Sequence, residues 1–166
     1  VVESAQRLCR ADVAQIHLLA GDQLRLARSA GSSQEVIDYM VSNPVDGDRS
    51  SLIGRVALSG RTQQITDVLA DPDYGRLDLQ RLAGLRTTLG VPMLLDDELV
   101  GVLLVWRTEV DPFDDRAAEL LTAFAAQAAI ALRSVDLVRA VEARSDELAH
   151  KVEQLEALAQ VGQVVS

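Results

Sequence analysis

The pattern of apolar and polar positions divides the chain into two regions. Up to about residue 132, short apolar segments alternate with turn-forming sequences, and this region holds all four prolines and nine of the ten glycines. From residue 133 onward there is no proline, Gly162 is the only glycine, and Ala, Val, Leu, Glu, Arg and Gln are frequent. Most of these residues favour helices. The pattern predicts a mixed domain over residues 1–132, followed by a long helix over 133–166.

Strands are predicted mainly in two hairpins with short turns. Within the second hairpin, the segment 99–106 is apolar at every position except Gly101. A strand that is apolar on both faces has to be covered on both faces. Pro92 suits the start of a strand or a bulge, because proline lacks the N–H that a ladder needs. The predicted hairpin strands are Asp12–Ala20 with Gln23–Ala30, and Thr87–Leu95 with Glu98–Trp106.

Helices are predicted from apolar spacing and capping residues. Gly60 ends a short helix, and Asp114 is suited to cap a long one. Between them, Leu69–Arg86 reads as a long polar connection, which inside a compact domain is usually functional or mobile. The expected helices are Glu3–Arg10, Ser32–Val41, Ser51–Ser59 and one from Asp114, and a further strand is expected at Gln63–Val68. The last helix carries an apolar stripe at Ala117, Leu121, Phe124, Ala128 and Leu132.

Beyond residue 132 the apolar spacing alternates between three and four residues, as in a coiled coil. β-Branched residues at a positions and leucines at d positions favour a parallel two-stranded coil. We therefore expect a homodimer through this helix. The alternative is an amphipathic helix that folds back on its own domain. The predicted dimer seam is Val138, Val141, Ser145, Leu148, Val152, Leu155 and Ala159, of which the apolar members Val138, Val141, Leu148, Val152 and Leu155 carry the contact.

Composition excludes several classes of partner. The net charge is −9, from 25 acidic and 16 basic residues, which disfavours contact with nucleic acid. A single cysteine excludes an intrachain disulfide and a cysteine-rich zinc site. No apolar run approaches ~20 uninterrupted residues, so we expect no membrane insertion and a cytoplasmic location. The chain begins at Val1 rather than Met and ends within a helical pattern, as expected of a piece of a longer protein.

No catalytic or metal-binding set can be assembled from the sequence. There is no phosphate-loop, metalloprotease or nucleophile-elbow motif. His17 lies on a predicted strand without a second ligand at metal spacing, and the paired aspartates fall in turns and caps. We expect no catalysis by this segment, and no metal site.

Three segments resemble GAF domains, in the same order along the chain. They are residues 51–68 (SLIGRVALSGRTQQITDV), 90–105 (GVPMLLDDELVGVLLV) and 112–132 (PFDDRAAELLTAFAAQAAIAL). The family also places a proline at the position of Pro92. The resemblance implies an α+β fold: a GAF-like antiparallel sheet sandwiched between helices, with the terminal helices on one face and a ligand pocket on the other. A long C-terminal coiled-coil helix then follows.

The tail resembles signalling helices that join GAF domains to each other or to an output domain. Parents of this type are commonly sensor histidine kinases, with nucleotide cyclases and phosphatases as other outputs. The ligand does not carry over. The signature of cyclic-nucleotide GAF domains has no counterpart, since Asn43 is the only asparagine. Cys9 lies on the wrong element for a bilin, and one cysteine is too few for a methionine-sulfoxide reductase.

The sequence therefore predicts a sensory module that binds an unidentified small molecule, dimerises, and controls a downstream output domain in the same chain. The cofactor is unknown. A ligandless dimerisation scaffold, with its pocket filled by its own side chains, is the alternative, and a haem or redox sensor acting through His17 is a weaker one. The candidate pocket residues are Tyr39, Tyr74, Arg76, Arg86, Thr88 and Trp106.

Overall fold

The computed structural model describes residues 1–165 and divides them into two compact units. The first unit is Val1–Ala129, and the second begins at Ile130. One helix, α5, has its first turns in the first unit, and its continuation forms the second unit. The two units are described separately below.

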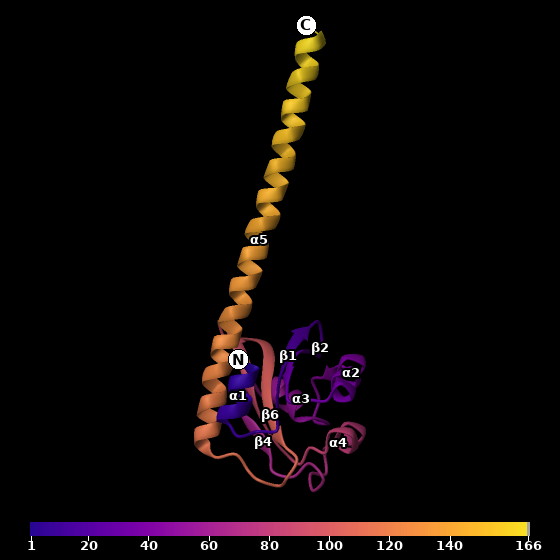
Figure 1. The fold of residues 1–166 in the computed structure, drawn as a ribbon, viewed down its shortest axis with the longest axis vertical. Helices are drawn as coiled ribbons and strands as arrows, with labels where there is room; N and C mark the ends of the chain where they lie inside the picture. Colours follow the sequence, from indigo (N-terminus) through magenta and orange to yellow (C-terminus); the bar gives the residue numbers. More distant parts are fainter. Residues whose placement is uncertain (166) are drawn as a thin grey trace. The chain divides into compact units, whose positions relative to one another are not determined.

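The first unit is built around a six-stranded antiparallel sheet with the strand order β3-β2-β1-β6-β5-β4 (Figure 1). The first and last long strands pair in its centre, with Val13 opposite Trp106 and Leu18 opposite Gly101. The predicted α+β antiparallel fold is therefore confirmed. The strands are β1 (Val13–Ala20), β2 (Gln23–Ala30), β3 (Val45–Asp46), β4 (Gln63–Ile65), β5 (Thr87–Leu95) and β6 (Glu98–Arg107).

Helices cover both faces of the sheet. Figure 1 shows α1 and the first turns of α5 on one face, and α2, α3 and α4 on the other. The Cys9 Sγ lies 3.7 Å from the Ala117 carbonyl oxygen, which joins the two helices of the first face. The helices are α1 (Val2–Leu8), α2 (Gln34–Ser42), α3 (Leu52–Ser59), α4 (Leu77–Ala83) and α5 (Asp115–Val165).

The central strand β6 is buried on both faces, as its composition predicts. Leu104 and Trp106 join the core cluster that includes Met40, Leu52 and Leu79 from α2, α3 and α4. Leu103, which alternates with them along the strand, is fully buried outside that cluster. The sheet therefore separates two apolar layers.

Turns and caps follow the local sequence. Gly21 has φ 64° in the first hairpin turn, and Asp96 and Asp97 have φ 50° and 65° in the second, a left-handed pair suited to tight hairpins. The predicted cap of α5 is confirmed, since the Ala117 N–H donates to Asp114 Oδ1 at 2.8 Å. Gly60 ends α3 in the left-handed conformation, as expected.

Two elements were not predicted. The connection Leu69–Arg86 contains α4, and a two-residue strand, β3, follows the break at Asn43–Pro44. The strand predicted over Gln63–Val68 ends at Ile65. In the stripe predicted for the long helix, Phe124 and Leu132 are only half-buried, and the buried positions are Ala117, Leu121, Ala125, Ala128 and Ala129.

Pro92 lies within β5 rather than at its start. It is opposite Val102 of β6, and the register shifts just beyond it, between Met93 and Leu94. On its other side, the pairing of β5 with β4 reaches only Gly90. Pro92 therefore has a strand neighbour on one side, which is where a sheet tolerates the missing N–H.

The second unit is the continuation of α5, a helix of 51 residues in total. Within residues 1–165, no residue of α5 after Ala129 is buried. The five apolar seam residues are between 48% and 68% exposed. By length and composition alone, α5 is apolar enough to cross a membrane, but the buried residues in its first turns show it serving as a core helix of the first unit.

Candidate functional site

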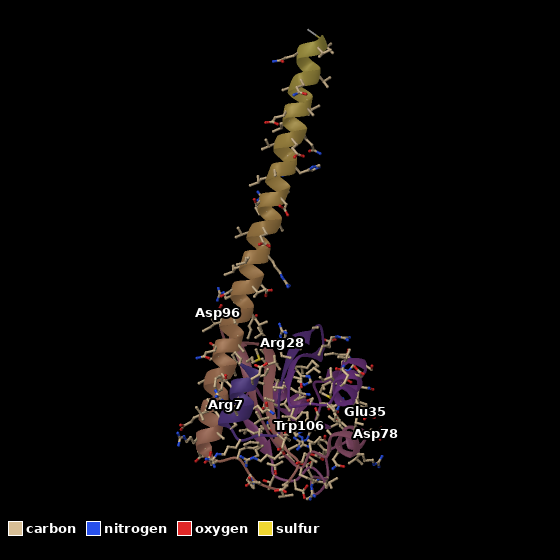
Figure 2. The ribbon with its side chains drawn as sticks, viewed as in Figure 1. Arg7, Arg28, Glu35, Asp78, Asp96 and Trp106 are labelled. Atoms are coloured by element: carbon tan, nitrogen blue, oxygen red, sulfur yellow. The ribbon has the colours of Figure 1, made fainter. Side chains whose placement is uncertain are left out.

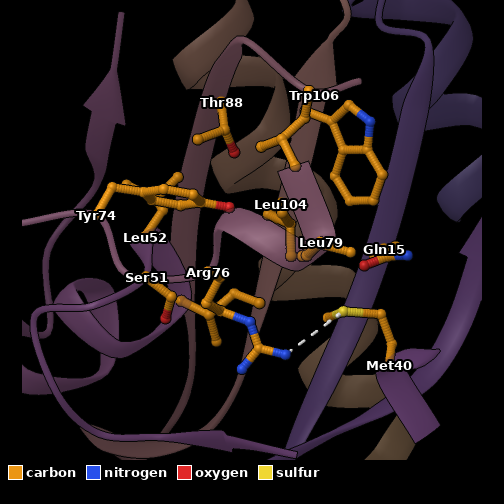
Figure 3. A pocket seen from close by; sticks show the side chains of 12 residues that line it. Gln15, Met40, Ser51, Leu52, Tyr74, Arg76, Leu79, Thr88, Leu104 and Trp106 are labelled. Carbon is orange, nitrogen blue, oxygen red and sulfur yellow. Dashed lines mark hydrogen bonds between the residues drawn. The ribbon is translucent and has the colours of Figure 1, made fainter. Parts of the chain in front are cut away.

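A small cavity lies between the sheet and the helices α2, α3 and α4. Its volume is about 20 Å³, which is room for roughly one water molecule. Residues from every neighbouring element contribute to it, and Figure 3 shows their side chains converging. The lining residues are Gln15, Met40, Ser51, Leu52, Ile53, Tyr74, Arg76, Leu79, Leu85, Thr88, Leu104 and Trp106.

Arg76 is the one charged side chain in this lining. Its Nη2 donates to the Asn43 carbonyl oxygen at 2.9 Å and lies 3.9 Å from the Met40 Sδ. The guanidinium carbon lies 6.0 Å from the centre of the Tyr39 ring. Across the described chain, no carboxylate pairs with Arg76, and its buried Nε–H has no acceptor. The cavity therefore borders a positive charge that no acidic side chain neutralises.

Trp106 and Tyr74 supply further donors of the lining. Trp106 is 2% exposed, and its Nε1–H has no acceptor within residues 1–165. The Tyr74 side chain reaches toward Leu104 across the cavity in Figure 3. Burial raises the pKa of Tyr74 to about 12, so the Tyr74 hydroxyl keeps its proton at neutral pH. Figure 2 shows Trp106 inside the domain, whereas Glu35 and Asp78 project outward from α2 and α4.

A polar cluster on β1 borders the cavity. Gln15 Nε2 donates to the hydroxyl oxygens of Ser29 and Ser32, and Gln15 Oε1 lies 3.0 Å from His17 Nε2. His17 is fully buried, and its Nδ1 has no partner among the residues described. Burial, assisted by the nearby positive charge of Arg76, lowers the pKa of His17 to about 3. His17 is therefore neutral at physiological pH.

Three ion pairs hold the segment that carries Tyr74 and Arg76. Arg55 of α3 binds both oxygens of Asp71, and the Arg55 side chain is only 10% exposed. The Arg55 guanidinium lowers the pKa of Asp71. The other two pairs, which are more exposed, are Arg86 with Asp67 and Arg49 with Asp73.

The sequence-predicted pocket residues divide into two groups. Tyr74, Arg76, Thr88 and Trp106 line the cavity. The other two do not: Tyr39 lies beside Arg76 outside the lining, and Arg86 points to Asp67 instead.

The sequence analysis missed Gln15 and Ser51, the other polar residues of the lining. The signal for Gln15 was the alternation along β1, where Val13, Gln15 and His17 fall on one face. A polar residue among core positions of a buried strand indicates an internal hydrogen-bonded site. Ser51 caps α3 by accepting from the Gly54 N–H at 3.0 Å, whereas the sequence analysis placed it only as the first residue of a short helix.

Metal and haem chemistry find no support at these residues. Within residues 1–165, no three or more His, Cys, Asp or Glu side chains are grouped to hold a metal ion. His17 is not part of the cavity lining, and its Nε2 is engaged by Gln15. Cys9 is buried beside α5, on the opposite face of the sheet from the cavity.

The GAF domain family matches residues 1–133, which is most of the chain. The chain belongs to the GAF domain family. This GAF domain has solved structural neighbours that share its fold at low sequence identity. No protein of curated function matches it.

One neighbour is the GAF domain/HD domain protein from Geobacter sulfurreducens, with 19% identity and a TM-score of 0.68 over 81% of this chain and 91% of that one. The GAF domain of an Acinetobacter phosphoenolpyruvate-protein phosphotransferase has 19% identity and a TM-score of 0.68 over 82% and 80%. The type II free methionine-R-sulfoxide reductase from Thermoplasma acidophilum has 16% identity and a TM-score of 0.60 over 76% and 88%. Most such domains are regulatory, but this last neighbour is an enzyme, so the fold alone does not decide activity.

Proposed function

We propose that this GAF domain is a cytoplasmic sensory module that binds a small molecule in the cavity beneath α2, α3 and α4 and regulates an output domain in the same chain. The observation that carries the proposal is the set of unpartnered polar groups at the cavity. Arg76 Nε and Trp106 Nε1 are buried without partners in the described chain, and the Tyr74 side chain belongs to the same lining. Buried donors without acceptors cost roughly 1–3 kcal/mol each, and a ligand that supplies acceptors removes that cost.

The proposed partner of the C-terminal helix is a second copy of the same helix, arranged in parallel. The seam from Val138 to Leu155 supports this, because its apolar side chains are exposed in the single chain. Glu147 and Lys151 form an ion pair within the helix at 3.0 Å, which supports helix formation. The proposed module contacts no nucleic acid and does not insert into a membrane.

The proposed output domain is that of a sensor histidine kinase, with a nucleotide cyclase as the alternative. The support is the resemblance of the tail to signalling helices. A ligand biases such an output only if it binds one arrangement of the module better than another. The segment itself is proposed to have no enzymatic activity, since a nucleophile–base pair is not found at the cavity lining.

A ligandless dimerisation scaffold is a second candidate, favoured by the cavity volume of about 20 Å³. Native mass spectrometry of the purified chain separates the two, because one spectrum reports the subunit count and any retained mass. A dimer with a bound small molecule supports sensing. A dimer without added mass, unchanged after incubation with a metabolite extract, supports the scaffold. A monomer at all concentrations contradicts the dimer.

A further inference from the structure

The cavity offers hydrogen-bond donors in excess of acceptors, which restricts the chemistry of its ligand. The buried donors without partners are Arg76 Nε–H and Trp106 Nε1–H, and Tyr74 adds a hydroxyl to the same lining. Thr88 Oγ1 already donates to the Val105 carbonyl oxygen at 3.2 Å, which leaves its lone pairs as acceptors. A ligand that satisfies this lining has to bring acceptors of its own.

Charge restricts the ligand further. Arg76 carries a positive charge that no carboxylate of the described chain neutralises, although the chain as a whole has a net charge of −9. The nearby Arg55, by contrast, forms an ion pair with Asp71. A cationic ligand would be repelled by Arg76, whereas an anion gains a charge-assisted hydrogen bond there. Because an acidic surface disfavours multiply charged anions at a distance, a monoanion fits best.

The remainder of the lining is apolar. Leu79 and Leu104 lie between Arg76 and Trp106 in Figure 3, and Leu52 lines the cavity beside Tyr74. Apolar walls favour a hydrocarbon body and give no partner to a polar one such as a sugar. The lining therefore favours a single negative charge joined to a short apolar chain.

Resting on the proposed sensory function, we propose that the cavity binds a short-chain organic monocarboxylate, with its carboxylate paired to Arg76 and hydrogen-bonded by the Tyr74 hydroxyl. Burial raises the pKa of Tyr74, so the hydroxyl stays protonated and can donate a hydrogen bond. A chain of several carbon atoms needs more room than about 20 Å³, so binding moves the segment that carries Tyr74 and Arg76 outward from the sheet.

The test uses the intrinsic fluorescence of Trp106, the single tryptophan of the chain, with calorimetry as the second readout. The probes are butyrate and valerate, their neutral amides, and butylammonium as the cation of matched size. We expect a saturable change in emission with the carboxylates at millimolar concentrations or below. The amides should bind about 10-fold or more weakly, because hydrogen bonds to charged groups are the stronger ones, and butylammonium should not bind.

Two variants locate the carboxylate. Arg76→Gln should weaken valerate binding by about 10- to 100-fold, and Tyr74→Phe by about 2- to 10-fold, in keeping with charged and neutral hydrogen bonds. Arg61→Gln removes an exposed arginine outside the lining and should leave binding unchanged. Circular dichroism and the thermal midpoint show whether each variant folds, and the comparison of carboxylate with amide on the unaltered protein does not depend on them.

Equal binding of amides and carboxylates, or unchanged binding by folded Arg76→Gln, would overturn the carboxylate assignment and leave the sensory function standing. A lack of response to both carboxylates would also overturn the carboxylate assignment and leave the sensory function standing, if native mass spectrometry retains another small molecule. Absence of both a response and a retained molecule would count against the sensory function itself.

Discussion

The Arg55 guanidinium donates two hydrogen bonds to the Asp71 carboxylate, from Nη1 to Oδ2 at 2.7 Å and from Nη2 to Oδ1 at 2.8 Å. Arg55 belongs to α3, and Asp71 precedes Tyr74 and Arg76 in the same connection. This pair therefore joins a core helix to the segment that brings Tyr74 and Arg76 to the cavity. The Arg55 Nε–H also donates to the Arg49 carbonyl oxygen at 2.7 Å.

Removal of this pair should destabilise the domain. For Arg55→Gln we expect a loss of about 1–3 kcal/mol in the free energy of unfolding, because Asp71 is left partly buried without its partner. Urea unfolding followed by Trp106 fluorescence measures it. The matched control is Arg49→Gln, whose ion pair with Asp73 is largely exposed and should contribute less than about 1 kcal/mol. Equal effects of the two variants would contradict the assigned role.

Stability should fall with decreasing pH because of His17. Its pKa is about 3 in the folded protein and 6.5 as the ordinary value, so the unfolded chain takes up the proton first. The contribution of neutral His17 is complete above pH 6.5 and is lost as pH falls toward about 3. Below pH 6.5 the slope approaches roughly 1.4 kcal/mol per pH unit.

His17→Leu should therefore flatten the pH dependence of the free energy of unfolding between about pH 5 and 6.5, a window above the range in which carboxylates titrate. His150→Gln is the control, because His150 is exposed on α5. A slope in His17→Leu equal to that of the unaltered protein would show that His17 is not the responsible group.

Gly54 is required by close packing of the backbone. A Cβ at Gly54 would lie 2.2 Å from the Asp48 carbonyl oxygen and 2.7 Å from that of Asp46. We expect Gly54→Ala to destabilise the domain by about 3 kcal/mol, at the upper end for overpacking. Gly162→Ala, also in a helix but with nothing within 4 Å, should instead raise helix stability by about 0.5–1 kcal/mol. Thermal unfolding by circular dichroism distinguishes the two signs.

The proposed seam is tested by one charge placed on it. Leu148→Asp should convert the dimer to a monomer in sedimentation or light scattering, because the aspartate would be buried between two apolar helices. Ala157→Asp places the same charge at an f position, away from the seam, and should remain a dimer. A dimer in both variants would place the interface elsewhere.

Much of the fold could be predicted because its local signals agree. Gly21 and the pair Asp96–Asp97 mark the hairpin turns, and the apolar strand 99–106 requires two covered faces. The helix α4 was missed because it has only seven residues, Leu77–Ala83, and its N-cap residue Arg76 forms no side-chain cap. Its one buried side chain, Leu79, leaves too short a pattern to detect.

The cavity was harder to predict than the fold. Trp106 and Thr88 follow from strand alternation, but Arg76 and Tyr74 come from an irregular connection whose path depends on tertiary contacts with Arg55 and Asn43. Arg86 has the same side-chain chemistry as Arg76, and the sequence gives no reason for one to face Asp67 and the other the cavity. Which acceptor each arginine contacts is decided by the tertiary structure, not by the local sequence.

The pairing of β1 with β6 also determines when the domain can form during synthesis. Val13 and Trp106 are opposite each other in the sheet but 93 positions apart in the chain. The N-terminal hairpin can form early, yet its inner edge stays open until β6 has left the ribosome. Such distant contacts are slow to form because a long loop has to close first. The nascent chain therefore exposes an unpaired strand edge from the synthesis of β1 until β6 is complete, so termination before Arg107 should yield an aggregating fragment rather than a smaller folded domain.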